Sequence, residues 1–288
     1  MPQFSLMIVA FIFTISKDSI SMTAGTKLQV LIATHQAAGI ERVRDMDLPS
    51  VEGVEYLVSW QAHGDLPVPS ALLTRPDIAV LRFDGVGVSA NRNNLLNHST
   101  APLVLIADDD LRYAPGAFER IIEVAQANPD VDYFSFRYDG ADNKNYPPAE
   151  CDLKHLPENF YQTAFEVALR RSPRTGGLQF NEKFGPGAPV FTVGEDEMLL
   201  LTARRMGLVC RFFPLTITCH KGLTTGSRPL SIGSARSAGA IIRLQNPVTW
   251  FLRIPLYAWR RAKEGRMTFR SALRHAAYGA FHASGAMS

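Results

Sequence analysis

The sequence is poor in cysteine and lacks the short signatures of several large enzyme classes. Its three cysteines, Cys151, Cys210 and Cys219, form no CxxC pair, so neither a disulfide framework nor a zinc site of that kind is indicated. No GxSxG, HExxH or Walker A sequence occurs, which leaves a serine hydrolase, a zinc protease and a P-loop enzyme without support. So few cysteines are typical of a reducing compartment, and we expect a cytoplasmic protein.

A long apolar run is also missing. The most apolar stretch, residues 4–15, is shorter than the about twenty residues that span a bilayer. No Lys or Arg precedes it, as one would in a signal peptide. We therefore interpret residues 1–26 as an extension outside the fold, whose apolar stretch lies upstream of a predicted start at Met22, with a weak membrane anchor as the alternative.

Basic residues gather at the C-terminal end. Residues 231–288 contain nine Lys or Arg and one acid, Glu264, and carry a net charge of +8, whereas the rest of the chain carries −5. Between residues 245 and 274, arginines alternate with aromatic and aliphatic residues, and Pro247 and Pro255 interrupt the run, which predicts at least two helical pieces. Such a tail suits peripheral contact with the anionic inner face of the cytoplasmic membrane, and it equally suits packing on the preceding domain. Its clustered aromatics do not favour nucleic acid.

A short apolar segment that ends in three carboxylates lies near the middle of the chain. Residues 103–107 read LVLIA and are followed by Asp108, Asp109 and Asp110. The segment is typical of a strand buried on both faces, and ligands bind at the carboxyl ends of such strands. Alternate acids there can converge on Mg²⁺ or Mn²⁺. The alternative is a solvated turn that caps the next helix.

Strand-like and helix-like segments alternate along most of the chain. This order predicts an α/β fold with a mainly parallel sheet flanked by helices, followed by a basic helical tail. The predicted division is 1–26, 27–230 and 231–288. Residues 139–158 are predicted to form a long loop. The other predicted strands are 28–34, 54–59, 77–83, 131–138, 208–213 and 215–219, and predicted helices cover 39–46 or begin after Ser89, Pro115 and Gly194.

The segment GVGVSA, residues 85–90, has two interpretations. It fits G-x-G-x-x-A between a strand and a helix, with Asp108 at the next strand end, as in an NAD(P)-dependent oxidoreductase. Against this, the unit is third in the sheet, bulky polar residues 91–94 open the helix, and three acids follow where one would suffice. In the other interpretation, Arg92 stands beside the acidic strand end and binds a donor phosphate.

Three segments in order resemble the family 2 glycosyltransferases of the GT-A fold, in particular bacterial enzymes of capsular or exopolysaccharide synthesis. They are GVSANRN at 87–93, LVLIADDDL at 103–111 and FGPGAPVFTVGEDEMLL at 184–200. The resemblance covers about residues 27–226. It implies an inverting, Mn²⁺- or Mg²⁺-dependent transfer of a hexose-type sugar from a nucleotide diphosphate, most simply UDP, to a glycan or lipid-linked glycan. A binding protein on the same fold, with an idle Asp196, is the non-enzymatic alternative.

The resemblance also assigns roles to individual residues. It implies catalysis by Asp196 as general base with Glu195 beside it, and we expect the helix dipole to keep Asp196 ionised. Two departures are visible: Ser59 occupies a position where the family commonly has an Asp that contacts the base, and His220 is followed by Lys221 where Pro is frequent. The implied donor site consists of Thr34, Ser59, Arg92, Asp108, Asp109 and Gly187, and the implied metal ligands are Asp108, Asp110 and His220.

Overall fold

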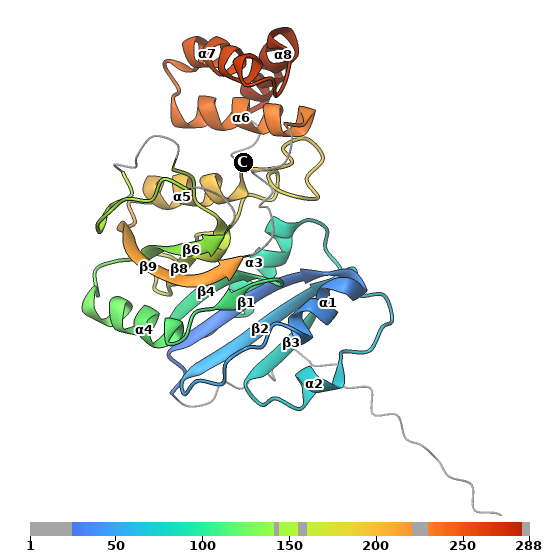
Figure 1. Ribbon diagram of the computed structural model, residues 1–288, viewed down its shortest axis with the longest axis vertical. Coiled ribbons are helices and arrows are strands. Elements are labelled where there is room, and N and C mark those ends of the chain that lie inside the picture. The colour runs from blue at the N-terminus through green and yellow to red at the C-terminus, as the bar shows by residue number, and fades with distance from the viewer. Residues whose placement is uncertain (1–24, 141–143, 155–159, 221–229, 284–288) are drawn as a thin grey trace, which may run out of the picture.

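The computed structural model describes residues 25–140, 144–154, 160–220 and 230–283. In this part of the chain, one mixed sheet of nine strands lies between helices, and a further layer of helices covers one end of the molecule (Figure 1). The strand order is β3-β2-β1-β4-β8-β6-β9-β5, and β7 pairs with β9 outside this path. The predicted α/β class is confirmed.

The first half of the sheet is parallel. It consists of β1 (Leu28–His35), β2 (Val54–Gln61), β3 (Ile78–Phe83) and β4 (Leu103–Asp108). Parallel strands end at one edge, and the register places Ala33 beside Asp108 and His35 beside Gln61. The ends of β1, β2 and β4 therefore meet at the edge where ligands bind in open α/β sheets.

The second half of the sheet is mixed. β8 (Val167–Arg170) runs antiparallel between β4 and β6 (Tyr133–Gly140), and β9 (Cys210–His220) runs parallel to β6. The short strands β5 (Arg112–Tyr113) and β7 (Cys151–Asp152) are antiparallel to β9. The sequence did not reveal β8, because four residues are too few to show a period of two.

The two strands predicted on either side of Pro214 are one strand, β9, so this prediction is wrong. Pro214 is exposed, and the register with β6 shifts between the pairs Ser135–Phe212 and Arg137–Thr216. A proline, which has no N–H, is tolerated at such an irregularity. The strand continues to His220, and the β5–β9 pairing brings this residue back to the segment that follows β4.

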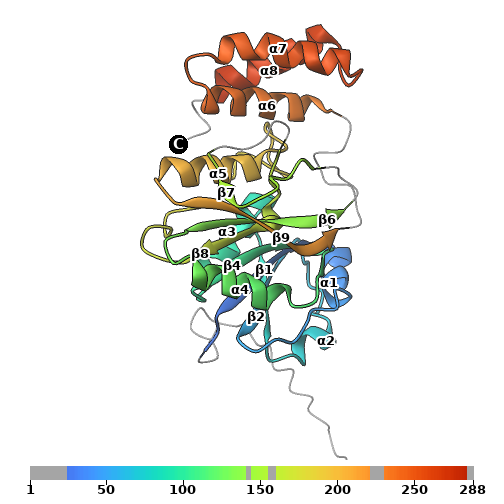
Figure 2. The same cartoon turned by 60° about the vertical axis from the view of Figure 1, so that its left-hand side comes forward.

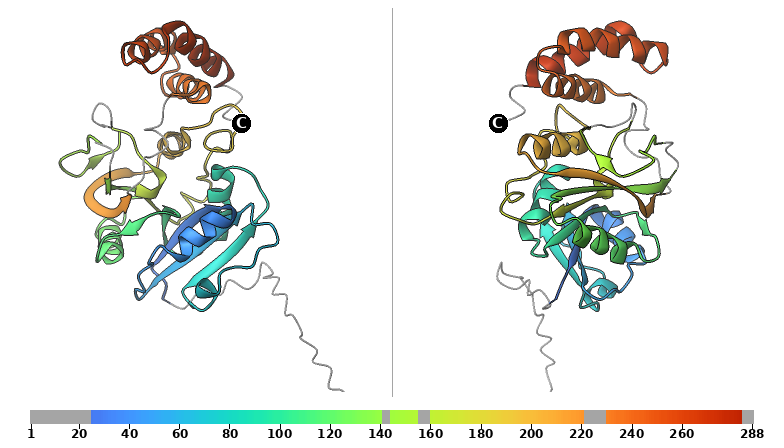
Figure 3. Two further views of the ribbon diagram at one scale, coloured as in Figure 1. Left: turned by 45° about the vertical axis from the view of Figure 1, so that its right-hand side comes forward. Right: turned by 90° about the vertical axis from the view of Figure 1, so that its left-hand side faces the viewer.

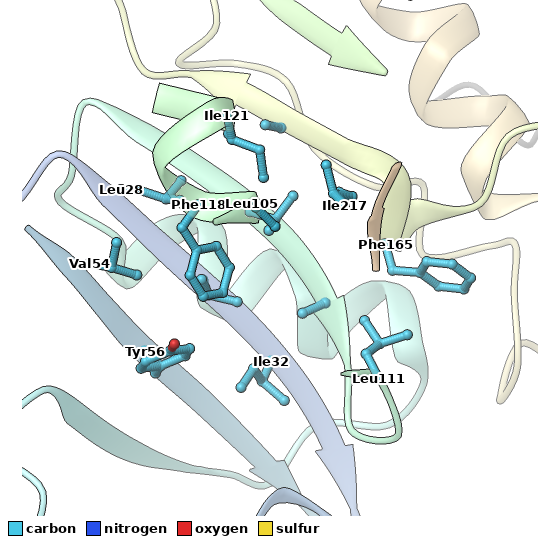
Figure 4. Packing of buried hydrophobic residues seen from close by; sticks show 14 of the residues in the cluster. Leu28, Ile32, Val54, Tyr56, Leu105, Leu111, Phe118, Ile121, Phe165 and Ile217 are labelled. Atoms are coloured by element: carbon cyan, nitrogen blue, oxygen red, sulfur yellow. The ribbon is translucent and has the colours of Figure 1, made fainter. Parts of the chain in front are cut away.

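Helices cover both faces of the sheet (Figure 2). α1 (Gln36–Arg44) and α4 (Ala117–Ala127) pack on one face, where the cluster shown in Figure 4 includes Ile32 and Phe118. α3 (Val88–His98) and α5 (Glu195–Arg205) pack on the other, where Leu31 and Leu95 belong to one apolar cluster. Successive residues of β1 thus serve opposite cores, as the pleat of a strand requires. The four-residue α2 (Ser70–Leu73) precedes β3.

Three helices form the C-terminal layer: α6 (Ile232–Gln245), α7 (Trp250–Lys263) and α8 (Phe269–His282). α6 lies between α5 and the pair α7 and α8 (Figure 3). α6 and α8 approach closely at two glycines. A Cβ on Gly239 would overlap the backbone of Ala276, and a Cβ on Gly279 would overlap that of Arg236. The predicted domain boundary at residue 231 stays a prediction.

Pro255 does not interrupt the tail as predicted, since it lies inside α7. A proline at this position removes the N–H that would bond to the carbonyl of Phe251. Both residues are exposed, so water can reach that carbonyl. Within the described ranges, no helix has the length and apolar character needed to cross a bilayer.

Some predicted features lie outside the described residues. They include residues 1–24 of the predicted extension and the junction 221–229 between β9 and the tail. Of the loop predicted over 139–158, the described residues show the end of β6 and the strand β7, which docks on β9.

Gly239→Ala tests the close crossing of α6 and α8. Alanine favours an isolated helix, but here its methyl group must push α8 away, and we expect a loss of about 1–3 kcal/mol of unfolding free energy. Urea unfolding measures the loss. The control is Gly176→Ala, where a Cβ would find no atom closer than 3.7 Å. Equal stability of Gly239→Ala and the unmodified chain would contradict the observed packing.

Candidate active site

Arg92 joins acidic residues from two elements that are far apart in the sequence. It is buried in the first turns of α3, and its Nη2 donates to Asp108 Oδ1 at 2.7 Å. Its Nη1 lies 3.5 Å from Glu195 Oε1 and 3.4 Å from Asp196 Oδ1. Asp108 ends β4, and Glu195 and Asp196 begin α5. The predicted donor acid and the predicted base therefore share one cation.

The surroundings of Asp196 favour its neutral form. Burial raises the pKa of Asp196 well above its ordinary value, and the nearby Glu195 raises it further, whereas Arg92 and the backbone N–H of Ala164 lower it. The effect of burial on this pKa opposes that of the helix dipole, and the expectation that Asp196 is ionised stays a prediction. Once deprotonated, a carboxylate with a raised pKa is a stronger base.

The neighbouring charges respond to the same burial. Burial opposes the charge on Arg92, but Asp108, Asp196 and Glu195 outweigh it and raise the pKa of this guanidinium. Burial also raises the pKa of Glu195, against the effect of Arg92. Burial, and then Asp196, raises the pKa of Glu197 to about 7. Burial thus raises the pKa of all three carboxyls at the start of α5, and Arg92 opposes this effect on Glu195 and Asp196.

The two asparagines that flank Arg92 fix the start of α3. Asn91 Nδ2 donates to the carbonyls of Thr34 (3.0 Å) and Ser59 (3.2 Å) at the ends of β1 and β2. Asn93 donates to the carbonyl of Phe180 at 2.9 Å and accepts from its N–H at 2.8 Å. These bonds explain why such polar side chains can be buried between a helix and a sheet.

The turn that carries Gly187 packs on the same end of α3. Val88 N donates to Pro186 O at 3.0 Å, and Ser89 Oγ donates to Phe184 O at 2.7 Å. Gly187 has a φ of +93°, and a Cβ on it would lie 2.7 Å from Gly87 Cα. The carbonyl of Pro186 thus accepts a hydrogen bond from the first N–H of α3. In the dinucleotide interpretation, a pyrophosphate would bind to this N–H.

A pocket of about 340 Å³ lies at the carboxyl ends of β1 and β2. Its walls also include the start of α3, the turn at Pro186 and Gly187, and the side chain of Asp109. Its volume lies in the range of roughly 300–1,000 Å³ that is usual for small-molecule sites. Three of the predicted donor residues, Thr34, Asp109 and Gly187, line this pocket.

Asp109 is held in the pocket wall by α1. Arg42 donates to both of its carboxylate oxygens at 2.9 Å, and Thr34 Oγ1 donates to Oδ2 at 2.6 Å. A Cβ on Gly39 would overlap Thr34 Oγ1, so this glycine makes room for the contact. Sequence reasoning missed Arg42 and Gly39, although a glycine within a helical segment signals a close approach.

Ser59 lies behind the pocket wall. It is fully buried, and its hydroxyl accepts a hydrogen bond from Asn94 Nδ2 at 2.9 Å. Gln61, two residues farther along β2, lines the pocket in its place. The predicted contact between Ser59 and the nucleotide is therefore corrected: Ser59 supports α3, and Gln61 is the candidate from β2.

Asp110 and His220 form a second polar pair at the end of the sheet. His220 Nε2 lies 3.2 Å from Asp110 Oδ2, and Nδ1 of the buried His220 has no hydrogen-bond partner among the described residues. Asp108, the third predicted metal ligand, is bound to Arg92 and does not join this pair.

The pair of Asp110 and His220 is a sparse donor set. In the part of the chain that the structure covers, no group of three or more His, Cys, Asp or Glu lies ready to hold a metal. Mg²⁺ commonly takes one or two carboxylates and completes its shell with water and substrate phosphates, and Mn²⁺ also accepts imidazole. The two residues fit such an ion together with a diphosphate.

Comparison with known families decides between the interpretations of this site. Residues 69–182 match the family model described as Glycosyl transferase family 2. This part of the chain is therefore similar to the family 2 glycosyltransferases. The matched segment includes Arg92 and the three consecutive aspartates, and it ends before the acidic start of α5. The prediction of a glycosyltransferase is confirmed.

Solved structures show the same fold. S. aureus TarS 1-349 in complex with UDP-GlcNAc has a TM-score of 0.56 and 14% identity, with 82% of this chain and 73% of that chain covered. The mannosyltransferase PcManGT from Pyrobaculum calidifontis, in complex with GDP-Man and Mn²⁺, has a TM-score of 0.53 and 18% identity, with coverage of 91% and 76%. The GT-A fold of the family 2 domain is thereby confirmed. No curated protein matches the chain in sequence.

Arg92→Gln tests the role of the shared cation. Removing it leaves the partly buried Asp108, Glu195 and Asp196 together without their cation. Breaking a fully buried ion pair costs about 3–5 kcal/mol, and we expect a loss up to this size. Without Arg92 the pKa values of Glu195 and Asp196 rise further, so protonation relieves the repulsion at low pH. We expect the loss of unfolding free energy to be larger at about pH 8 than at about pH 5.

Urea unfolding of this variant at both pH values provides the measurement. The control is Arg120→Gln, because Arg120 is exposed and bonds only to backbone carbonyls of its own segment among the described contacts. A loss for Arg92→Gln that is as small as for the control, or that is larger at the lower pH, would contradict the electrostatic account.

Proposed function

We propose that the chain transfers a sugar from a nucleotide diphosphate, most simply a UDP-hexose, to a glycan or lipid-linked glycan in surface polysaccharide synthesis. The observation that carries the proposal is the meeting of Asp108 and Asp196 at Arg92, next to the pocket at the ends of β1 and β2. The proposed setting is the inner face of the cytoplasmic membrane. UDP-GlcNAc bound to TarS, a relative in fold, is consistent with a UDP-sugar donor.

The pocket is the proposed nucleoside site. Thr34, Gln61 and the Asn91 side chain provide polar groups on its walls, and Asn91 Oδ1 is buried with no hydrogen-bond partner among the described residues. A buried acceptor without a partner is costly unless a ligand satisfies it. A donor N–H or hydroxyl of the nucleoside would supply that bond.

The diphosphate is proposed to lie between the pocket and the pair of Asp110 and His220. These two residues would hold Mn²⁺ or Mg²⁺, which when bound would stabilise the negative charge that develops on the departing diphosphate. Asp108 is bound to Arg92, so it faces the donor as part of an ion pair. This arrangement keeps Asp110 as the main candidate ligand among the three aspartates.

Asp196 is the proposed general base. The acceptor hydroxyl gives its proton to the Asp196 carboxylate while its oxygen forms a bond to the anomeric carbon, and the bond from that carbon to the diphosphate oxygen breaks. A single displacement of this kind inverts the anomeric centre. Glu195 is the second carboxyl beside this base, and its contact with the same guanidinium holds it in place.

Asp196→Asn tests the base. A positioned base contributes about 10²–10⁴-fold to rate, so we expect a loss of that size in nucleotide diphosphate release with unchanged affinity for the donor. The assay measures release with Mn²⁺ over a panel of nucleotide sugars and acceptors, and calorimetry measures donor binding. Asp130→Asn, at an exposed turn, is the matched control.

Two results would count against the base. Full activity of Asp196→Asn would exclude this carboxyl from proton transfer. Tight donor binding without release by the unmodified chain, for every donor and acceptor, would favour a binding protein on the same fold.

Asp110→Ala tests the proposed metal site. We expect donor affinity in the presence of Mn²⁺ to fall by about tenfold or more, because the diphosphate loses its bridging cation. His220→Ala should weaken binding in the same direction. Calorimetry of a UDP-sugar with and without Mn²⁺ measures the effect, with Asp130→Ala as the control. Donor binding that is independent of Mn²⁺ in all of these proteins would reject the metal site.

A further inference from the structure

The outermost helices carry a row of large apolar side chains in contact with solvent. On α7, Phe251, Leu252, Leu256 and Trp259 are 55%, 63%, 46% and 54% exposed. Leu252, Leu256 and Trp259 follow the spacing i, i+4, i+7, which places them on one face of the helix. Val248, just before the helix, is 79% exposed. These five residues are called the α7 face.

The α7 face is distinct from the side of the helix that packs inward. Ile254 and Ala258 are buried, and Ile254 packs with Ala276 and Ala280 of α8. A helix on the surface of a soluble protein usually has an apolar inner side and polar residues on its outer side. α7 is apolar on both sides, and a contiguous exposed apolar patch marks a place of interaction.

The charges around the α7 face have one sign. Arg253, Arg260 and Lys263 are exposed on the same helix. The single acid of residues 231–288, Glu264, accepts a hydrogen bond from Arg261 at 2.8 Å. Glu264 thus offsets Arg261 and leaves the positive charge of Arg253, Arg260 and Lys263 on this surface, which favours a partner that is anionic as well as apolar.

We propose that the α7 face docks on an anionic lipid bilayer. Phe251, Leu252 and Leu256 enter the boundary between headgroups and acyl chains, where Trp259 also finds its preferred depth. Arg253, Arg260 and Lys263 reach the lipid phosphates. The helix lies in the plane of the surface, because its 14 residues are too short to cross a bilayer.

Other occupants fit this surface less well. A second copy of the chain would bring an equal positive charge, and like charges oppose such a contact. A nucleic acid would match the charge but would leave the apolar side chains in water. Only a surface with anionic groups above an apolar layer matches both properties.

The place of α7 in the molecule permits this contact without any rearrangement. α7 and α8 form the end of the molecule that is farthest from the sheet, with α6 between them and α5 (Figures 1 and 3). α6 contributes Ala240 to an apolar cluster with Phe184, Phe191 and Met198, on the turn and helix beside the proposed base. Docking would therefore set the orientation of this side of the active site relative to the bilayer.

Flotation of the full chain with lipid vesicles tests the proposal. We expect binding to equimolar phosphatidylglycerol and phosphatidylcholine, and binding to pure phosphatidylcholine that is about tenfold weaker or more. Leu252→Glu/Trp259→Glu should reduce binding to the anionic vesicles by about tenfold or more, and Arg253→Gln/Arg260→Gln should remove the preference for them. Leu73→Glu is the control, because Leu73 is 66% exposed on α2.

Thermal unfolding and donor binding of each variant accompany the flotation. They should be unchanged, since the substituted side chains face solvent and lie outside the donor pocket, so a failed proposal can be distinguished from a failed assignment of function. Unchanged flotation of Leu252→Glu/Trp259→Glu, or no binding by the unmodified chain, would overturn the proposal. So would a dimer of the unmodified chain that this variant converts to a monomer while neither binds vesicles.

Discussion

The site depends on one buried guanidinium shared by three carboxyls. Arg92 is bound to Asp108 and lies close to Glu195 and Asp196, so it joins a helix start, a strand end and a second helix start. Three partly buried carboxyls without this cation would repel one another or bind protons. The close packing of α3 and α5 against the end of β4 is therefore compatible with ionised acids only while Arg92 stays in place.

The order of the strands explains how distant segments reach this cation. β4 lies at the centre of the sheet, so its carboxyl end meets β1 on one side and the mixed half on the other. β9 returns His220 to the neighbourhood of Asp110 through its pairing with β5. The pocket, the ion cluster and the pair of Asp110 and His220 all form where β4 ends. Asp109 lines the pocket, Asp108 belongs to the ion cluster, and Asp110 belongs to the pair.

The sequence predicted the parts of the site that depend on local pattern. An apolar run followed by acids identified β4 and its end, and the acidic start of α5 was visible as GEDE at 194–197. The partners of these side chains could not be predicted, because they depend on packing between distant elements. Ser59 is the example: its position in the chain suggested a ligand contact, but the approach of Asn94 from α3 buries it and leaves Gln61 on the pocket.

The distances around Arg92 also bear on how a buried carboxyl could act as a base. The contact with Asp108 is a hydrogen bond of 2.7 Å, whereas those with Glu195 and Asp196 are 3.5 and 3.4 Å. The cation is thus engaged more strongly with the donor side than with the base. Burial and the nearby Glu195 raise the pKa of Asp196, and Arg92 opposes them. A carboxylate with a raised pKa accepts a proton from a hydroxyl more readily than an exposed aspartate does. Arg92 thus holds the acids together, while burial favours the basicity that the proposed transfer requires of Asp196.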